Sequence, residues 1–122
     1  MREMIIDTDT GSDDAIALLM ALSDKHTEVL ALTTVFGNVN LSQATRNALI
    51  SCEVAGVKVP VYPGMDRPLV RERIEATHVH GSDGLGDAGI HDPKLKAETK
   101  HAVSALIDII SEHDDIELIT LG

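Results

Sequence analysis

Short apolar runs alternate in this sequence with longer segments whose apolar residues recur at helical spacing. The runs lie at residues 3–7, 28–36, 57–64 and 116–122, and the helical segments lie at 15–22, 41–56 and 101–113. Strands that alternate with helices in this way are typical of an α/β fold with a mostly parallel sheet and flanking helices. Such sheets bind ligands beyond the carboxyl ends of their strands, so residues there are the first candidates for a site.

The ends of the predicted helices can also be placed. Residues 15–22 are apolar on every side, which predicts a buried helix. Asp13 or Asp14 is expected to cap its N-terminus, because carboxylates suit the positive end of a helix. Gly56 is expected to end the helix at 41–56.

Two stretches depart from the regular alternation. Residues 65–98 are rich in glycine, charge and histidine and show little periodicity; an irregular stretch of that length is usually functional or mobile. The last predicted strand ends with the chain, and no closing helix follows it. We therefore expect residues 1–122 to be the N-terminal part of a single, longer domain.

The composition limits which cellular compartment and which kinds of partner are expected. Twenty acidic against ten basic residues give a formal charge of −10, which argues against nucleic acid or an anionic membrane as a partner. Cys52 is the one cysteine, so a reducing compartment, the cytoplasm, is expected. Its place on an apolar helix face predicts a core residue. We find no signal-peptide pattern and no apolar run near the ~20 residues of a membrane span.

Four aspartates fall within eight residues, between the first apolar run and the first helical segment. Asp7 and Asp9 are two apart and share one side if the strand continues through them. Asp13 and Asp14 follow a turn at Gly11, so all four carboxylates can converge. A hard cation with oxygen ligands, Ca²⁺ or Mg²⁺, would relieve their repulsion, and the cluster therefore predicts a metal site.

Two known motifs fail to explain the whole cluster, and the first of them, the EF-hand loop, is excluded. An EF-hand loop beginning at Asp7 needs glycine at its sixth position and glutamate at its twelfth, where Ser12 and Leu18 stand instead. A phosphatase of the haloacid dehalogenase type has a strand ending in DxDx[TV]. "IIDTDTG" matches both aspartates but has glycine where Thr or Val belongs, and the second aspartate pair has no role there. This alternative would be Mg²⁺-dependent, with Asp7 as nucleophile and Asp9 as acid.

A third motif covers the whole cluster. The sequence resembles the inosine-uridine-preferring nucleoside hydrolase family, whose signature DxDxGxDD stands complete at residues 7–14. "TTVFGNVNL" (33–41) is similar to the family's GN loop, and "HVHGSDGLGD" (78–87) is similar to its HGxxGL segment. "ELITLG" (117–122) resembles a strand that precedes calcium and substrate contacts. The resemblance implies a Rossmann-like nucleoside hydrolase core.

The resemblance also implies a role for each aspartate. Asp9 and Asp14 would bind Ca²⁺, and Asp9 would be the general base as well. Asp13 would bind a ribose hydroxyl, Asn38 would lie beside the ribose and the attacking water, and Asp7 would support the loop and the ligand shell.

The histidines differ in their sequence surroundings. His80 stands in the HGxxGL match, on a loop that in the family closes over the base, and is a candidate catalytic residue. The others in polar surroundings are expected to be solvated: His78, His91, His101 and His113.

The implied activity is Ca²⁺-dependent hydrolysis of the N-glycosidic bond of a ribonucleoside. That bond breaks through an oxocarbenium-like transition state, with a carboxylate taking the proton of the water. The family's other calcium- and ribose-binding residues lie later in its chains, so residues 1–122 alone are expected to bind calcium weakly and to hydrolyse little. The expected partners are a ribonucleoside and further copies of the chain, the C-terminal part, or both. An inactive fragment is the non-enzymatic alternative.

Overall fold

The computed structural model describes residues 1–74, 77–90 and 92–122. Within them, one parallel sheet has the order β3-β2-β1-β4. Its strands are β1 (Arg2–Thr8), β2 (Thr27–Thr34), β3 (Val61–Pro63) and β4 (Ile116–Thr120). The helices are α1 (Ser12–Ser23), α2 (Leu41–Ala55), the one-turn α3 (Thr77–His80) and α4 (Ala102–Glu112). The predicted α/β architecture is confirmed.

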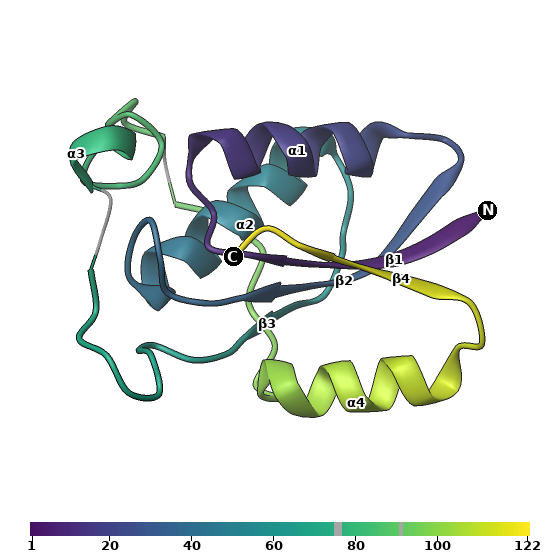
Figure 1. Cartoon of the computed structure of the whole chain (residues 1–122). Helices are drawn as coiled ribbons and strands as arrows, with labels where there is room; N and C mark the ends of the chain where they lie inside the picture. The colour runs from purple at the N-terminus through teal and green to yellow at the C-terminus, as the bar shows by residue number, and fades with distance from the viewer. Residues whose placement is uncertain (75–76, 91) are drawn as a thin grey trace.

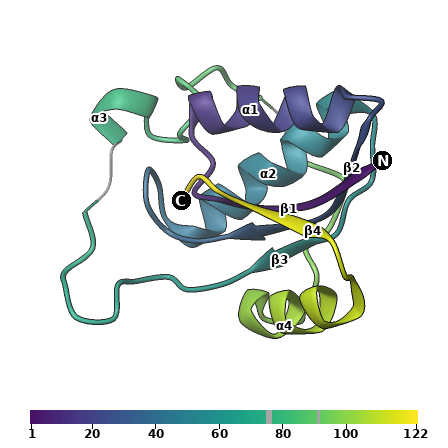
Figure 2. The same ribbon diagram turned by 45° about the vertical axis from the view of Figure 1, so that its right-hand side comes forward.

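The sheet is covered on both faces. In Figure 1, α1 and α2 lie over one face and α4 lies under the other, while α3 stands apart beyond the carboxyl ends of the strands. The rotated view keeps this arrangement (Figure 2). Helices on both faces explain why β1 has an unbroken apolar run: Ile5 is fully buried on one side, and Met4 and Ile6 are buried on the other.

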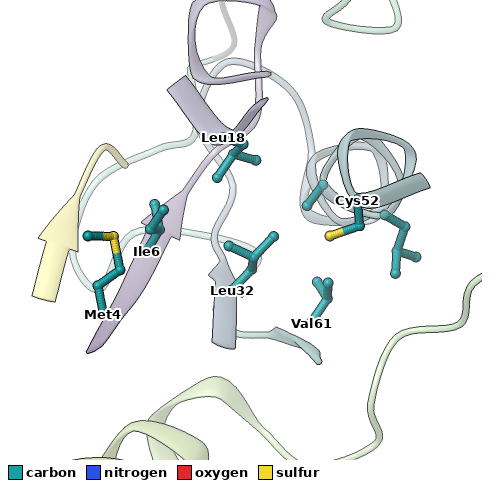
Figure 3. Packing of buried hydrophobic residues seen from close by; sticks show 8 residues of the cluster. Met4, Ile6, Leu18, Leu32, Cys52 and Val61 are labelled. Carbon is teal, nitrogen blue, oxygen red and sulfur yellow. The ribbon is translucent and has the colours of Figure 1, made fainter. Parts of the chain in front are cut away.

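The main core fills the space between the sheet and the α1–α2 layer. Figure 3 shows Ile6, Leu32 and Val61 from three strands meeting Leu18 of α1 and Cys52 of α2. Cys52 is fully buried, so its predicted place in the core is confirmed. This aliphatic core fixes how the carboxyl ends of β1 and β2 sit relative to the start of α1.

Helix α1 differs from its prediction in two ways. It begins at Ser12 with Gly11 as its N-cap, so Asp13 and Asp14 lie inside the first turn and the prediction that one of them is the cap is wrong. Acidic residues there still interact favourably with the helix dipole. The helix is also not buried all round, because Ile16 and Met20 face away from the sheet and are 61% and 71% exposed.

The other helix ends follow local chemistry. Gly56 adopts the left-handed conformation (φ 70°) directly after α2, as predicted. His101 caps α4, since its ring accepts a hydrogen bond from the Val103 amide (3.1 Å). The side of α4 that packs inward is formed by Ala102 and Ala105. In the described part of the chain, no helix has the length and apolar character needed to cross a membrane.

Candidate functional site

The polar residues singled out from the sequence gather at the carboxyl edge of the sheet. Asp9 follows β1 directly, and Asn38 lies in the loop that follows β2. The end of the chain reaches the same edge, where the Leu121 amide donates to the Asp7 carbonyl (2.8 Å). Figures 1 and 2 both place the C-terminus beside the connection from β1 to α1. This edge is where a parallel sheet binds its ligands.

Asp9 is held by the loop after β2. Its Oδ2 accepts a hydrogen bond from the Asn38 backbone amide (2.9 Å). The preceding residue, Gly37, lies so close that a Cβ there would come within 2.1 Å of Asp9 Oδ2 and 2.7 Å of Asp9 Cβ. Only glycine therefore lets this loop approach the carboxylate.

Gly37→Ala tests that close approach. We expect it to displace Asp9 and to lower the free energy of unfolding by about 1–3 kcal/mol, the usual cost of overpacking. Gly56→Ala is the control, because it strains a left-handed residue but a Cβ there meets nothing within 4 Å. Urea unfolding with and without Ca²⁺ separates the two: both variants lose stability, and only Gly37→Ala also loses its response to the metal. An equal response of the two variants to Ca²⁺ would contradict the conclusion that Gly37 holds Asp9 in place for a metal.

Asp14 comes from the first turn of α1 and is buried against Asp9. Its Oδ2 accepts from the Thr8 hydroxyl (3.1 Å) and, at 3.5 Å, from the Gly11 amide. Burial, followed by the hydrogen-bond contact with Asp9 and its charge, raises the pKa of Asp14 from 3.8 to about 7. The buried Asp14 carboxyl therefore lies against the half-buried Asp9 at the edge of the sheet, where a cation would be favourable.

Asp7 supports the edge from within β1. Its Oδ1 accepts a hydrogen bond from the Thr33 hydroxyl (2.6 Å), and Thr33 is its register partner on β2. On the other side, a Cβ at Gly122 would lie 3.1 Å from Asp7 Oδ2. Asp7 is thus tied to the neighbouring strand and packed against the last residue of the chain.

Asp13 and His80 meet at the N-terminus of α1. The Asp13 side chain is 79% exposed, and its carboxylate lies 3.9 Å from His80 Nδ1. The His80 ring is largely buried, with Nδ1 3.0 Å from the Ser12 hydroxyl. Gly11 lies between this group and the loop after β2, since a Cβ there would be 2.8 Å from Asn38 Nδ2 and 2.9 Å from His80 Nδ1. Asp13 and His80 therefore lie at the same edge of the sheet as Asp9 and Asn38.

The paired carboxylates of Asp9 and Asp14 suit a hard cation, because they are oxygen ligands and their repulsion would be relieved by it. In residues 1–74, 77–90 and 92–122, no group of three or more His, Cys, Asp or Glu is arranged to hold a metal. Ca²⁺ takes about 6–8 oxygen ligands. These two residues fit part of a calcium site, which further oxygens must complete.

Several contacts of the site were missed in the sequence. Thr33 and Ser12 lie inside the matched segments 33–41 and 7–14 but have no assigned role there. Only the strand register and the fold of the glycine-rich segment place them beside Asp7 and His80. Gly37 was within reach, because it belongs to the GN loop that the resemblance singled out.

The remaining histidines follow the expectation only in part. His101 is exposed but caps α4. His113 is bonded to Glu3 (2.7 Å) and half-buried, so the expectation that it is solvated is wrong. The His78 side chain and His91 lie outside the described residues.

Comparison with known proteins shows which family the chain resembles. A profile of the family described as inosine-uridine preferring nucleoside hydrolase matches residues 4–122. The inosine-uridine preferring nucleoside hydrolase of Crithidia fasciculata is 41% identical over 115 residues, which are 93% of this chain and 36% of that protein. Uridine nucleosidase 1 of Arabidopsis thaliana is 44% identical over 125 residues, 99% of this chain and 37% of that protein.

Solved structures show the same relationship. The purine-preferring ribonucleoside hydrolase from Gardnerella vaginalis has a TM-score of 0.92 and 33% identity, covering 99% of this chain and 40% of that one. The chain thus spans between 36% and 40% of the length of these relatives. The profile covers nearly all of residues 1–122, including the aspartate cluster and the segment around His80. The chain belongs to the inosine-uridine preferring nucleoside hydrolase family.

Proposed function

We propose that residues 1–122 form the N-terminal part of a Ca²⁺-dependent ribonucleoside hydrolase, which cleaves the N-glycosidic bond to ribose and free base. The observation that carries this proposal is the convergence of Asp9, Asp14 and Asn38 at the carboxyl edge of the sheet. The names of the relatives specify inosine, uridine or purine substrates, which differ in the base and share the ribose. A ribonucleoside is therefore the substrate class we propose.

Each polar side chain would have a distinct task. Asp9 would take the proton of the attacking water, a role that contributes about 10²–10⁴-fold. The Asn38 amide holds the Asp9 carboxylate in place, and the Asn38 side chain would contact the ribose. Asp13, exposed at the start of α1, would bind a ribose hydroxyl, and His80 beside it would face the leaving base.

Asp9 and Asp14 would hold the Ca²⁺ ion. When bound, the ion would supply positive charge that lowers the pKa of a water and neutralises the paired carboxylates. Asp7 would keep this pair in register, because its bond to Thr33 fixes the end of β1 against β2. The same edge of the sheet would orient the ribose, so that the attacking water lies in the right position relative to the bond that breaks.

The remaining ligands would come from further polypeptide packed on the β4 side. Strand β4 is an edge of the sheet, and Leu118 on it is 46% exposed. The outer side of α4 exposes Val103, Ile107 and Ile110. Parallel strands and apolar helix faces are normally covered, so we propose that a C-terminal part or a second copy covers them. We also propose a cytoplasmic location, consistent with a buried free thiol at Cys52.

The test compares two proteins. The first is the 122-residue chain. The second, called the completed chain below, joins residues 1–122 to the C-terminal segment of Arabidopsis uridine nucleosidase 1 that lies beyond the aligned region. Release of free base from inosine and uridine is measured after dialysis against EDTA and again after Ca²⁺ is restored. We expect turnover only in the completed chain with Ca²⁺.

The same assay includes a generic phosphoester with Mg²⁺. Release of phosphate without release of base would contradict the hydrolase proposal and support the phosphatase alternative. Base release that survives EDTA would contradict the calcium requirement alone. A completed chain that folds and releases neither product would support the inactive fragment.

A further inference from the structure

Asn47 is a fully buried polar side chain on the inner face of α2. Its Nδ2 group donates two hydrogen bonds, to the backbone carbonyl of Thr10 (3.0 Å) and to that of Asp83 (2.7 Å). Its Oδ1 accepts from Gln43 Nε2 (2.9 Å). Both N–H groups of the amide therefore donate to main-chain carbonyls of other segments.

The two segments that Asn47 joins are the two loops of the candidate site. Thr10 belongs to the aspartate loop, residues 9–11, and Asp83 belongs to the glycine loop, residues 81–87, which follows His80 directly. These segments are 37 and 36 residues from Asn47 in the sequence. Asn47 therefore bonds both loops at once, beside the direct approach of Gly84 to the Thr10 carbonyl, which lies 3.4 Å from a Cβ at Gly84.

The glycine loop is packed directly on this side chain. Gly84 is buried, and a Cβ there would lie 3.0 Å from Asn47 Nδ2 and 2.9 Å from Val39 Cγ1. The loop is also tied internally, because the Gly86 amide donates to the His80 carbonyl (2.7 Å). A displacement of this loop would therefore move His80.

The aspartate loop is connected to Asn47 with similar directness. The Thr10 and Thr8 hydroxyls are 3.1 Å apart, and the Thr8 hydroxyl donates to Asp14 Oδ2 (3.1 Å). A displacement at Thr10 would therefore reach the carboxylate pair. Asn47 is therefore one point from which contacts lead to both halves of the site.

We propose that Asn47 is a positioning residue that sets the spacing between the aspartate loop and the glycine loop. A neutral amide is required, because leucine and aspartate of similar size cannot donate to the two carbonyls. The structural part of this inference stands without the proposed function, and only its effect on turnover rests on that function. Misplacement of catalytic groups by about 1 Å can cost about a hundredfold in rate.

The first test is amide hydrogen exchange in the 122-residue chain, comparing Asn47→Leu with Ser51→Ala. Ser51 lies one turn further along α2, is buried, and donates only to the Asn47 carbonyl (2.9 Å), so it is a matched control. We expect Asn47→Leu to raise exchange in residues 81–87 by at least about tenfold over Ser51→Ala, the equivalent of one net hydrogen bond. Equal exchange in the two variants would overturn the proposal.

The second test approaches the same contact from the glycine loop. Gly84→Ala and Gly86→Ala both place a side chain at a positive φ (78° and 71°), but a Cβ at Gly86 meets nothing within 4 Å. We expect only Gly84→Ala to raise exchange at residues 9–11, which Gly84 reaches through Asn47 and through the Thr10 carbonyl, 3.4 Å from a Cβ at Gly84. This pair tests the coupling of the two loops, and Asn47→Leu tests the share of that coupling that Asn47 carries. No effect of Gly84→Ala at residues 9–11 would contradict the coupling.

The third test is kinetic and uses the completed chain. We expect Asn47→Leu to lower kcat for base release by about a hundredfold and to change KM far less, because Asn47 positions groups and touches no substrate. Ser51→Ala should retain near-parental kcat. If the parent itself releases no base, the proposed function fails while the exchange result still decides the role of Asn47. A parental kcat in Asn47→Leu would overturn the positioning role.

Discussion

Asp9→Asn in the completed chain is expected to lower kcat for release of base by about 10³–10⁴-fold, at the upper end of what a general base contributes. The expectation is at the upper end because the same carboxylate would also bind Ca²⁺. Asparagine keeps an oxygen that can accept the hydrogen bond of the Asn38 amide, so the loop geometry is preserved. The measurement is kcat and KM for inosine and uridine at saturating Ca²⁺.

Two matched variants make this result specific. Asp115→Asn removes the same charge at an exposed position before β4 and should leave kcat unchanged. Asp7→Asn should lower kcat by only about tenfold, because an amide oxygen still accepts the bond from Thr33. The phosphatase alternative predicts the reverse order for release of phosphate, since Asp7 would be its nucleophile. A larger effect at Asp7 than at Asp9 would therefore reject the assigned roles.

Elements governed by local chemistry were predictable from the sequence. The predicted helix at 41–56 is observed at Leu41–Ala55, and Gly56 adopts the left-handed conformation that ends it. Apolar spacing and a glycine stop are properties of neighbouring residues, so they can be found without knowing the fold. The parallel sheet was predictable for the same reason, from the alternation of strands and helices.

The predictions are wrong where tertiary contacts determine the bounds or the burial of an element. The start of α1 was predicted three residues too late, because Gly11 forms the N-cap and nothing in its side chain marks it as one. Ile16 and Met20 were expected inside but lie on the side of α1 that the sheet does not reach. The strand predicted at 57–64 is reduced to Val61–Pro63, because only those residues pair with β2.

In the candidate site, too, local features were predictable and tertiary contacts were not. The spacing of the aspartates predicts that all four carboxylates can converge, and the resemblance singles out Asp9 and Asp14. The structure places those two in contact, but among the residues it describes no group of three or more such side chains is arranged to hold a metal. The partners Thr33 and Asn47 could not be predicted, because they depend on strand register and on the packing of α2 under two loops. Sequence thus indicates which groups carry the proposed chemistry, whereas the fold determines what holds them.

Asp14→Asn is expected to stabilise the metal-free chain at pH 8 and to abolish its stabilisation by Ca²⁺. In the folded chain, burial and the neighbouring Asp9 raise the pKa of Asp14 from 3.8 to about 7. The folded state therefore binds a proton more tightly than the unfolded state. Stability linked to this proton is fully present below about pH 4 and is lost as the pH rises toward 7. The loss can reach about 4 kcal/mol for a shift of about three units.

Urea unfolding between pH 4 and pH 8 in EDTA measures this linkage. The free energy of unfolding of the parent should fall relative to that of Asp14→Asn as the pH rises, since the other carboxylates are common to both chains. Asp13→Asn is the control: it removes the adjacent charge from a 79% exposed side chain and should keep most of the pH dependence. A parent-minus-variant difference that is flat across this range would show that burial does not hold the Asp14 proton.

Calcium should offset part of this penalty in the parent and not in Asp14→Asn. Above about pH 7 the Asp14 carboxyl carries its charge, and a cation that binds only the folded chain stabilises it by RT ln(1 + [Ca²⁺]/Kd). Asparagine at position 14 removes one of two charged ligands, so the midpoint of urea unfolding should no longer rise with Ca²⁺. Asp13→Asn should retain that rise. Because these readouts need no turnover, they test the metal-binding assignment of Asp14 in the 122-residue chain itself, and an equal rise in Asp14→Asn would remove that residue from the proposed calcium site.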